Sequence, residues 1–381
     1  MLPVWYKAAK PLIDSGEIAM LGVVQEQHAE RAQLYKQWKQ FDFPIVQDAT
    51  ASLNLQSVPI PLLIDEHGVV RSTRPRPGDL TQFVKKSFEP AEATAAKKAD
   101  DTAPGKATAL IATGNVYLHD IKQRDVEKAI DAFSQAVTAD PSSGKAKFSL
   151  GVARRMRFDS ADAKNGDFLA AAKLWSEALA LNPNQYIWRR RIEQYGPRLG
   201  KPYPFYDWVD DAIASIKKRG QEPIKLTVNL TGSELAGPAR AFASDTDAEN
   251  PDPQSKITVV DADLVQLNAS AVPAAVKPGS VVRLHLSLKA MRGKWNHEAG
   301  PLQVWVNESS NGTPEKRLLE FGRENDGATN NVSNVDFEFK TNAASDRPVV
   351  DGFVLFHFCD DEGVCFFARK DFKIEIGTIK K

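Results

Sequence analysis

The sequence predicts a multidomain chain in which an α/β layer, an all-α segment and an all-β segment follow one another. Short apolar runs alternate with helix-like segments over residues 1–88, apolar residues recur at helical spacing over 107–220, and strand-like runs separated by turn residues fill 221–381. Residues 89–106 are rich in Ala, Pro and charge without apolar periodicity, which is typical of a linker.

Composition supports a globular protein and excludes several classes. The 381 residues are 42% hydrophobic and 26% charged, and this length suits two or three domains. Lys plus Arg and Asp plus Glu both number 49, so no global basic field predicts a nucleic-acid partner. No apolar run reaches the roughly 18 residues of a membrane span, so none is expected. Two cysteines exclude a disulfide-dense scaffold and a four-cysteine zinc site, and no motif indicates a cofactor.

The first 88 residues alternate between helix-like and strand-like segments. Residues 3–15 place Val4, Ala8 and Leu12 at helical spacing, and EIAMLGVVQ follows as a continuous apolar run of strand length. Residues 28–41 again suit a helix, FPIVQD and PIPLLID suit short strands, and GDLTQFVKKSF suits a closing helix.

This segment resembles the thioredoxin-like proteins of the TlpA and peroxiredoxin-related (redoxin) group. The resemblance rests on LGVVQEQ, FPIVQD and SVPIPLLIDEHGVV, whose last run matches the family's hairpin at Leu63, Ile64, Asp65 and Gly68. It implies a cis peptide bond at Pro59, which in the family supports a redox site. The alternative is an edge strand with two ordinary trans prolines.

The chain departs from that family at its start. The family's first strand and Cys-x-x-Cys motif come just before the helix that here begins at Met1, and this chain has neither. We therefore expect an N-terminal layer without dithiol chemistry and without a central strand, whose remaining strands expose edges and apolar faces. The sequence is interpreted as a fragment or a mis-started reading frame, with a natural partial domain as the alternative. The lack of a signal-peptide pattern therefore carries little weight.

Residues 107–220 resemble tetratricopeptide repeats. Two sets of small, aromatic, small and proline residues share the relative positions 0, +4, +7 and +12: Ala129, Phe133, Ala136 and Pro141, then Ala171, Trp175, Ala178 and Pro183. The resemblance implies helical hairpins able to bind a peptide or protein ligand. Two repeats are few for such an array, so QYIWRRRIEQYGPRL and FYDWVDDAIASIKKRG are predicted to be capping helices.

The two cysteines stand at the ends of a predicted β-hairpin in the all-β segment, which we predict to be a β-sandwich. Cys359 and Cys365 flank DDEGV, between the strand-like runs FVLFHF and FFARKDFKIEI. A five-residue loop places the flanking positions opposite one another, at a Cα separation of about 4.5 to 5.5 Å that a disulfide can span. We therefore expect the two sulfurs to pair.

The surroundings of the pair bear on its role. Closing so short a ring stabilises a fold by roughly 2 to 2.5 kcal/mol, which is a weak reason for a bond in a sandwich of this size. The carboxylates of Asp360, Asp361 and Glu362 raise the pKa of a neighbouring thiol and disfavour the thiolate. The loop thus suits a pair that a partner reduces better than one that attacks unaided.

The segment CDDEGVC between aromatic strands resembles the N-terminal, immunoglobulin-like domain of the DsbD disulfide-interchange family. That resemblance covers about the last 100 residues. It implies an immunoglobulin-like sandwich and a redox-active pair that exchanges electrons with a thioredoxin-type or other thiol protein, in the periplasm or outside the cell. The chain departs from the family just after Cys365, where Phe366 and Phe367 replace the usual aromatic-proline pair.

Two further groups of side chains are candidates for chemistry. His357 shares a strand face with Cys359, so His357, Cys359 and Cys365 form a weak candidate site for copper or zinc. A histidine at a strand end is the plainer interpretation. His297 and Glu298, in a loop before a strand, suit acid–base work or an ordinary turn.

Two functions follow from these patterns. The first is a bacterial envelope protein for thiol–disulfide exchange, in which Cys359 and Cys365 are the redox pair, Asp360, Asp361, Glu362 and His357 surround them, and Pro59 supports the thioredoxin-like part. The second is a non-enzymatic scaffold in which the helical repeats bind a partner and the disulfide is structural.

Overall fold

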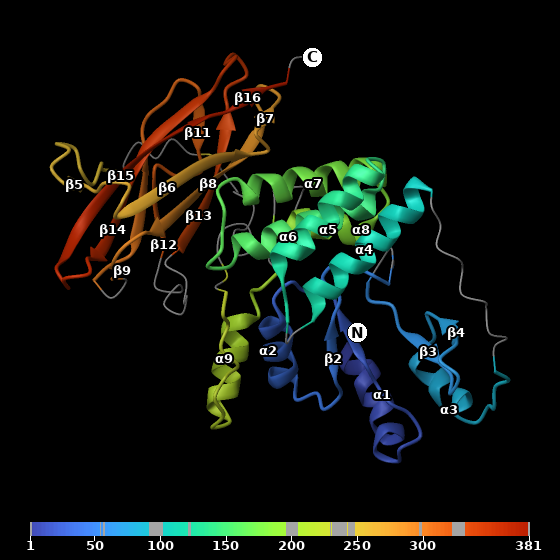
Figure 1. Cartoon of the computed structure of the whole chain (residues 1–381). Helices are drawn as coiled ribbons and strands as arrows, with labels where there is room; N and C mark the ends of the chain where they lie inside the picture. The colour runs from blue at the N-terminus through green and yellow to red at the C-terminus, as the bar shows by residue number, and fades with distance from the viewer. Residues whose placement is uncertain are drawn as a thin grey trace. The chain divides into compact units, whose positions relative to one another are not determined.

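The computed structural model describes residues 2–53, 55, 58–90, 102–120, 123–195, 205–228, 230, 242, 248–296, 299–321 and 332–379. They form a mixed α/β architecture, coloured along the chain in Figure 1. Contacts between Cα atoms divide the chain into two compact units. Unit 1 is Met1–Ala153, Ala178–Trp188 and Val209–Lys225, and unit 2 is Arg154–Glu177, Arg189–Trp208 and Leu226–Lys381. The units do not follow the three domain ranges expected from the sequence, which stay predictions.

The N-terminal part of unit 1 contains the helices and strands expected from its apolar pattern. In chain order these are α1 (Leu2–Asp14), β1 (Gly22–Val24), α2 (Ala29–Lys39), β2 (Ile45–Gln47), β3 (Leu62–Ile64), β4 (Val70–Thr73), η1 (Pro77–Asp79) and α3 (Leu80–Phe83). β1 pairs with β2 in parallel, and β3 pairs with β4 antiparallel, which leaves two separate two-stranded sheets.

The strands of these sheets expose apolar side chains, as expected for a layer that lacks a central strand. Val23 and Val46 face each other across β1 and β2 and are 43% and 44% exposed. Ile64 and Val70, paired across β3 and β4, are 52% and 46% exposed. The peptide bond from Val58 to Pro59 is cis, so the expected isomer is confirmed and the trans alternative is wrong.

Six helices follow in the described part of the chain. They are α4 (Ala103–His119), α5 (Val126–Ala139), α6 (Gly144–Phe158), α7 (Asp167–Leu181), α8 (Tyr186–Tyr195) and α9 (Val209–Lys218). α4 begins inside the expected linker because Thr102 accepts a hydrogen bond from the Gly105 amide and Pro104 occupies the first turn. No helix within the described residues combines the length and the apolar character that crossing a membrane requires.

Close packing explains the small residues of the α4–α5 hairpin. A Cβ atom at Gly114 would lie 2.4 Å from the Phe133 ring, so only glycine lets the two helices approach this closely. Ala129, Phe133 and Ala136 are fully buried on α5, and Trp175 is 1% exposed on α7. The small and aromatic residues that suggested repeats are therefore core residues of α5 and α7, whereas Pro141 and Pro183 are exposed turn residues that follow these helices.

Two sheets of unit 2 enclose one apolar core. One sheet has the order β12-β10-β14-β15-β5 with β9 also paired to β14, and the other has the order β11-β13-β8-β6. Buried side chains from both sheets form a single cluster, including Leu284, Phe337, Val354 and Phe356, so the sheets pack face to face. The strands are β5 (Thr258–Val259), β6 (Val265–Val272), β7 (Ala275–Val276), β8 (Val281–Ala290), β9 (Lys294–Trp295), β10 (Leu302–Val306), β11 (Gly312–Pro314), β12 (Leu318–Phe321), β13 (Val332–Thr341), β14 (Val349–Cys359), β15 (Cys365–Glu375) and β16 (Gly377–Thr378).

Candidate functional site

The two cysteines end the strands of one regular hairpin. β14 and β15 are antiparallel and in register along their whole length, from Val349 opposite Glu375 to Cys359 opposite Cys365. The sulfurs of Cys359 and Cys365 are bonded at 2.02 Å, with the Cα atoms 4.0 Å apart. The expected hairpin and the expected disulfide are both confirmed.

Asp360 organises the loop that joins the two strands. Its Oδ1 atom accepts hydrogen bonds from the amides of Glu362 at 3.0 Å and Val364 at 2.9 Å, and its own amide donates to the Val364 carbonyl at 3.0 Å. Gly363 has a φ of +82°, a conformation that favours glycine. Asp360, one of the three carboxylates of the loop, therefore stabilises the turn.

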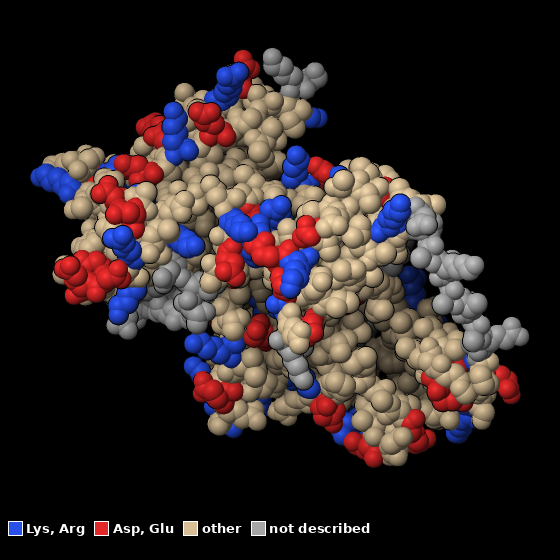
Figure 2. Space-filling view, in the orientation of Figure 1, with Lys and Arg blue, Asp and Glu red and all other residues tan. Residues whose placement is uncertain are grey.

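The two sulfur-bearing residues differ in access. Cys359 is 4% exposed, whereas Cys365 is exposed, as are Val364 at 57% and Phe367 at 37%. Figure 2 shows acidic side chains gathered at this end of the hairpin, with basic ones nearby. A partner approaching the pair from solvent would meet Cys365 first.

Strand pairing accounts for this difference. On the β14 side, β9 pairs with the end of the hairpin, placing Trp295 opposite Phe358 and Lys294 opposite Cys359. On the β15 side, β5 pairs with Ala368 and Arg369 and stops short of Cys365. The edge beside Cys359 is therefore covered, whereas among the described residues no strand pairs with the edge beside Cys365.

The turn that leads into β9 is tied to the hairpin. The Gly293 amide donates to Asp361 Oδ1 at 2.8 Å, and the Asn296 amide donates to the His357 carbonyl at 2.9 Å. The Trp295 ring packs edge-on against Phe356 and Phe358, with centroid distances of 5.2 and 5.8 Å. Asp361, predicted only as a charge near the sulfurs, thus also fixes a segment from elsewhere in the sequence.

His357 is held by packing. It is half-buried and its ring lies against Phe367, with centroids 4.6 Å apart. A Cβ atom at Gly300 would lie 2.9 Å from His357 Nε2, so the backbone closes over that nitrogen. Among the residues that the structure describes, no three His, Cys, Asp or Glu side chains gather as metal ligands, and both sulfurs are in the disulfide. His297 and Glu298 lie outside the described residues.

Pro59 belongs to unit 1 and the cysteine pair to unit 2. The hairpin next to Pro59 is held by Asp65, which accepts hydrogen bonds from the amides of His67 and Val69, both at 2.9 Å, and pairs with Arg71. Burial raises the pKa of Asp65, but the Val69 amide and the Arg71 guanidinium outweigh it, so the pKa lies below its usual value. Asp65, one of the residues on which the resemblance to thioredoxin-like proteins rests, therefore stabilises the β3–β4 hairpin.

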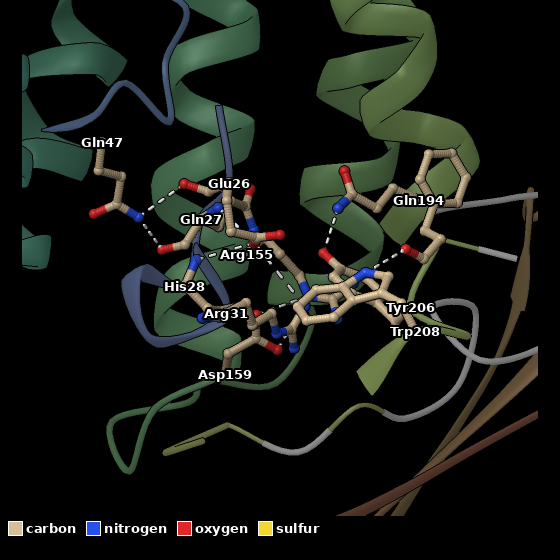
Figure 3. Close-up of polar contacts among 11 residues, drawn as sticks. Glu26, Gln27, His28, Arg31, Gln47, Arg155, Asp159, Gln194, Tyr206 and Trp208 are labelled. Carbon is tan, nitrogen blue, oxygen red and sulfur yellow. Dashed lines mark hydrogen bonds and ion pairs between the residues drawn. The ribbon is translucent and has the colours of Figure 1, made fainter. Parts of the chain in front are cut away.

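Figure 3 shows two further groups of polar contacts. In unit 1, Glu26 Oε1 accepts from the amides of Gln27 at 2.7 Å and His28 at 3.0 Å, just before α2 begins, and Gln47 Nε2 donates to the Glu26 carbonyl at 2.8 Å. The carboxylate satisfies amides near a helix N-terminus, where negative charge is favourable. In unit 2, the Gln194 amide donates to the Tyr206 hydroxyl. These contacts join segments of the fold.

Unit 2 also buries a histidine–aspartate pair that the sequence did not reveal. His285 Nδ1 lies 3.2 Å from Asp336 Oδ2, across β8 and β13, and the His285 ring stacks on Phe168 at 3.9 Å. Burial raises the pKa of Asp336, but the charge and hydrogen bond of His285, together with the charges of Arg283 and Arg155, outweigh it, so the pKa lies below its usual value. The two residues are 4% and 6% exposed, so a substrate from solvent would not reach them.

Comparison with known proteins adds no functional assignment. No protein-family model matches the chain, and no curated protein matches it. One similar solved chain comes from a structure described as "AvmM Catalyzes Macrocyclization in Alchivemycin A Biosynthesis". It shares 12% identity, covers 31% of this chain and 92% of its own, and has a TM-score of 0.17. A similarity at that score carries no argument about fold or function.

Proposed function

We propose that this protein takes part in thiol–disulfide exchange, with the Cys359–Cys365 disulfide accepting electrons from a thioredoxin-type dithiol protein. The observation that carries the proposal is the asymmetry of the pair, since Cys365 is exposed at the hairpin end while Cys359 is 4% exposed. A disulfide reacts when a thiolate reaches one of its sulfurs, and the other sulfur must leave. The hairpin offers one sulfur for attack and shelters the other.

The exchange runs in two balanced steps. A partner thiolate attacks Cys365 Sγ, a bond forms between the two sulfurs, and the electron pair of the old S–S bond leaves on Cys359 Sγ. The partner's second thiolate then attacks its own sulfur in the mixed disulfide and releases the Cys365 thiolate. The partner dithiol is oxidised to a disulfide, and the hairpin disulfide becomes two thiols after taking up two protons.

Two features favour exchange over a purely structural bond. The bond closes a very short loop, which stabilises the fold by only about 2 to 2.5 kcal/mol. The sandwich already has an extensive core of its own, shared by both sheets. The proposed location is periplasmic or extracellular, because disulfides persist in oxidising compartments.

The proposal is tested by reducing the oxidised full-length chain with a thioredoxin-type dithiol protein and by measuring the reduction potential of the pair. We expect reduction at physiological potential. Single-cysteine variants extend the test: the Cys365 thiol in Cys359→Ser should react with an aromatic disulfide reagent at least about tenfold faster than the Cys359 thiol in Cys365→Ser, because reaction follows access.

A structural bond gives the opposite results. A potential well below about −300 mV, together with no reduction by the dithiol protein, would contradict the proposal. The scaffold alternative, in which the helical hairpins bind a partner and the disulfide only stabilises the sandwich, would then be favoured. Unchanged binding of that partner by Cys359→Ser would support it.

A further inference from the structure

We propose that Lys294 stabilises the Cys359 sulfur as it leaves the disulfide. This inference rests on the proposed exchange function and assigns a role to a side chain outside the cysteine hairpin. The inference is based on a row of three residues that lie in register across three neighbouring strands: Lys294 on β9, Cys359 on β14 and Cys365 on β15.

The row places the lysine on the face of the sheet that carries the sulfurs. Residues opposite one another in paired antiparallel strands have side chains on the same face, with Cβ atoms about 4.5 to 5.5 Å apart. Trp295, the next residue, packs against the core residues Phe356 and Phe358. Because side chains alternate along a strand, Lys294 lies on the opposite face from Trp295, with Cys359.

The β9 turn fixes this position. Gly293 has a φ of +74°, and a Cβ atom there would lie 2.3 Å from the Cys359 carbonyl oxygen, so the turn approaches the hairpin as closely as only glycine permits. The hydrogen bond from the Gly293 amide to Asp361 and the packing of Trp295 hold the segment on either side of Lys294. The register of the lysine is therefore set by the fold.

The ammonium of Lys294 is not held by another group of the described residues. Its side chain is exposed and makes no hydrogen bond or ion pair within the described part of the chain. The other titratable or charged groups close by are His357, two residues from Cys359 on the same face of β14, exposed Arg292 on the β9 turn, and the loop carboxylates of Asp360, Asp361 and Glu362. Two of those carboxylates are engaged as acceptors, Asp360 by loop amides and Asp361 by Gly293.

The position of Lys294 matters for the first step of the exchange, in which a partially sheltered sulfur must leave as a thiolate. When the partner thiolate attacks Cys365, the electron pair passes to Cys359 Sγ, which becomes a thiolate at a site that is 4% exposed. A buried thiolate is costly, and a leaving thiol with a lower pKa leaves faster. The Lys294 ammonium, in the neighbouring register position, lowers the free-energy cost of forming the Cys359 thiolate. It also offsets the negative charge of the loop carboxylates.

The experiment compares Lys294→Gln, Lys294→Arg and Lys373→Gln in the full-length chain. Lys373 is a matched control, because it is an exposed lysine on β15, roughly 26 Å along the strand from Cys365. The oxidised proteins are reduced with excess dithiothreitol at pH 7, and the rate constant is followed. We expect Lys294→Gln to be about three- to tenfold slower and the other two variants to stay within about twofold of the parent.

A second readout separates charge from packing. In the Cys365→Ser background, the rate of Cys359 alkylation by iodoacetamide is measured against pH. Lys294→Gln should move the midpoint of this profile up by about 0.5 to 1 pH unit, Lys294→Arg should restore it, and added salt should shrink the difference. Equal rates and equal midpoints for Lys294→Gln and the parent would overturn the role of Lys294.

The exchange function and the role of Lys294 can each be disproved without disproving the other. If the dithiol protein reduces the parent chain and Lys294→Gln alters neither the rate nor the midpoint, the lysine role is wrong and the exchange function stands. If dithiothreitol shows the lysine effect but the dithiol protein does not reduce the chain, the exchange function is wrong and the electrostatic role stands.

Discussion

At the scale of single residues, the site depends on what each side chain does besides carrying charge. Asp360 and Asp361 were predicted from the sequence only as negative charges near the sulfurs. Asp360 closes the loop and Asp361 holds the Gly293 amide. Glu362 remains exposed at the tip. Two of the three carboxylates therefore also shape the loop and hold the β9 turn, which their charge alone does not reveal.

Gly293 gives a residue-scale prediction. Gly293→Ala should lower the urea midpoint of unit 2 more than Gly363→Ala. Both positions have positive φ, but only the Gly293 substitution also brings a Cβ atom to 2.3 Å from a carbonyl oxygen, while nothing lies within 4 Å at Gly363. We expect a loss of about 1 kcal/mol for Gly363→Ala and about 2 to 4 kcal/mol for Gly293→Ala.

The measurement is urea unfolding followed by the fluorescence of the tryptophans, with the disulfide intact. The Gly293→Ala variant should also make Cys359 more reactive in the Cys365→Ser background, since the turn can no longer lie against the hairpin. Equal midpoints for the two glycine variants would show that the turn moves away at little cost.

At the scale of helices and strands, local sequence pattern does not predict which strands pair when they are far apart in the sequence. The β14–β15 hairpin could be predicted because two strand-like apolar runs adjoin a five-residue loop that contains Gly363. The contact of β9 with Cys359 could not, because β9 is distant in sequence and only two residues long. Such a pairing depends on which edge of β14 stays free, and only the assembled sheet determines that.

Lys145 at the start of α6 gives an element-scale prediction. Its ammonium donates to the carbonyls of Thr50, at 2.7 Å, and Ala51, so it ties the helix to the segment after β2. Burial lowers its pKa to about 8, against an opposing effect of Asp48. The unfolded lysine binds its proton more tightly, at about 10.4, so the unfolded state holds more protons between these pH values.

The contribution of Lys145 should therefore make unit 1 more stable as pH rises from about 8 to 10. Urea midpoints measured across this range should rise for the parent relative to Lys145→Met, in which the titrating group is gone. Lys106→Met, at an exposed lysine of α4, serves as the control and should follow the parent. Parallel profiles for all three chains would contradict the buried position of the ammonium.

At the scale of the whole molecule, the described residues form two compact units, and the cysteine pair lies in one of them. The helices expected to form a separate middle domain divide between the units. The N-terminal sheets stay two-stranded and expose apolar pairs such as Val23 with Val46. Since two-stranded sheets are only marginally stable alone, the contact of β2 with α2 helps to stabilise the β1–β2 sheet.

The disulfide should matter little to this architecture. Replacing both cysteines by alanine should lower the unfolding free energy of unit 2 by about 2 to 2.5 kcal/mol and leave its strand content unchanged. Circular dichroism and urea unfolding of Cys359→Ala/Cys365→Ala measure both quantities. Loss of strand signal in the double variant would show instead that the bond is essential to the sandwich.

Features that depend on neighbours along the chain could be predicted before the fold was known. The strand and helix periods and the cysteine hairpin with its disulfide follow from short segments whose geometry is local, whereas the cis bond at Pro59 was implied by the resemblance of its segment to thioredoxin-like proteins. The exposure of Cys365, the burial of Cys359 and the position of Lys294 in their row are apparent only in the assembled sheets. The physical reason is that burial and register across a sheet depend on strands far apart in sequence, and one residue of register reverses the face on which each side chain lies.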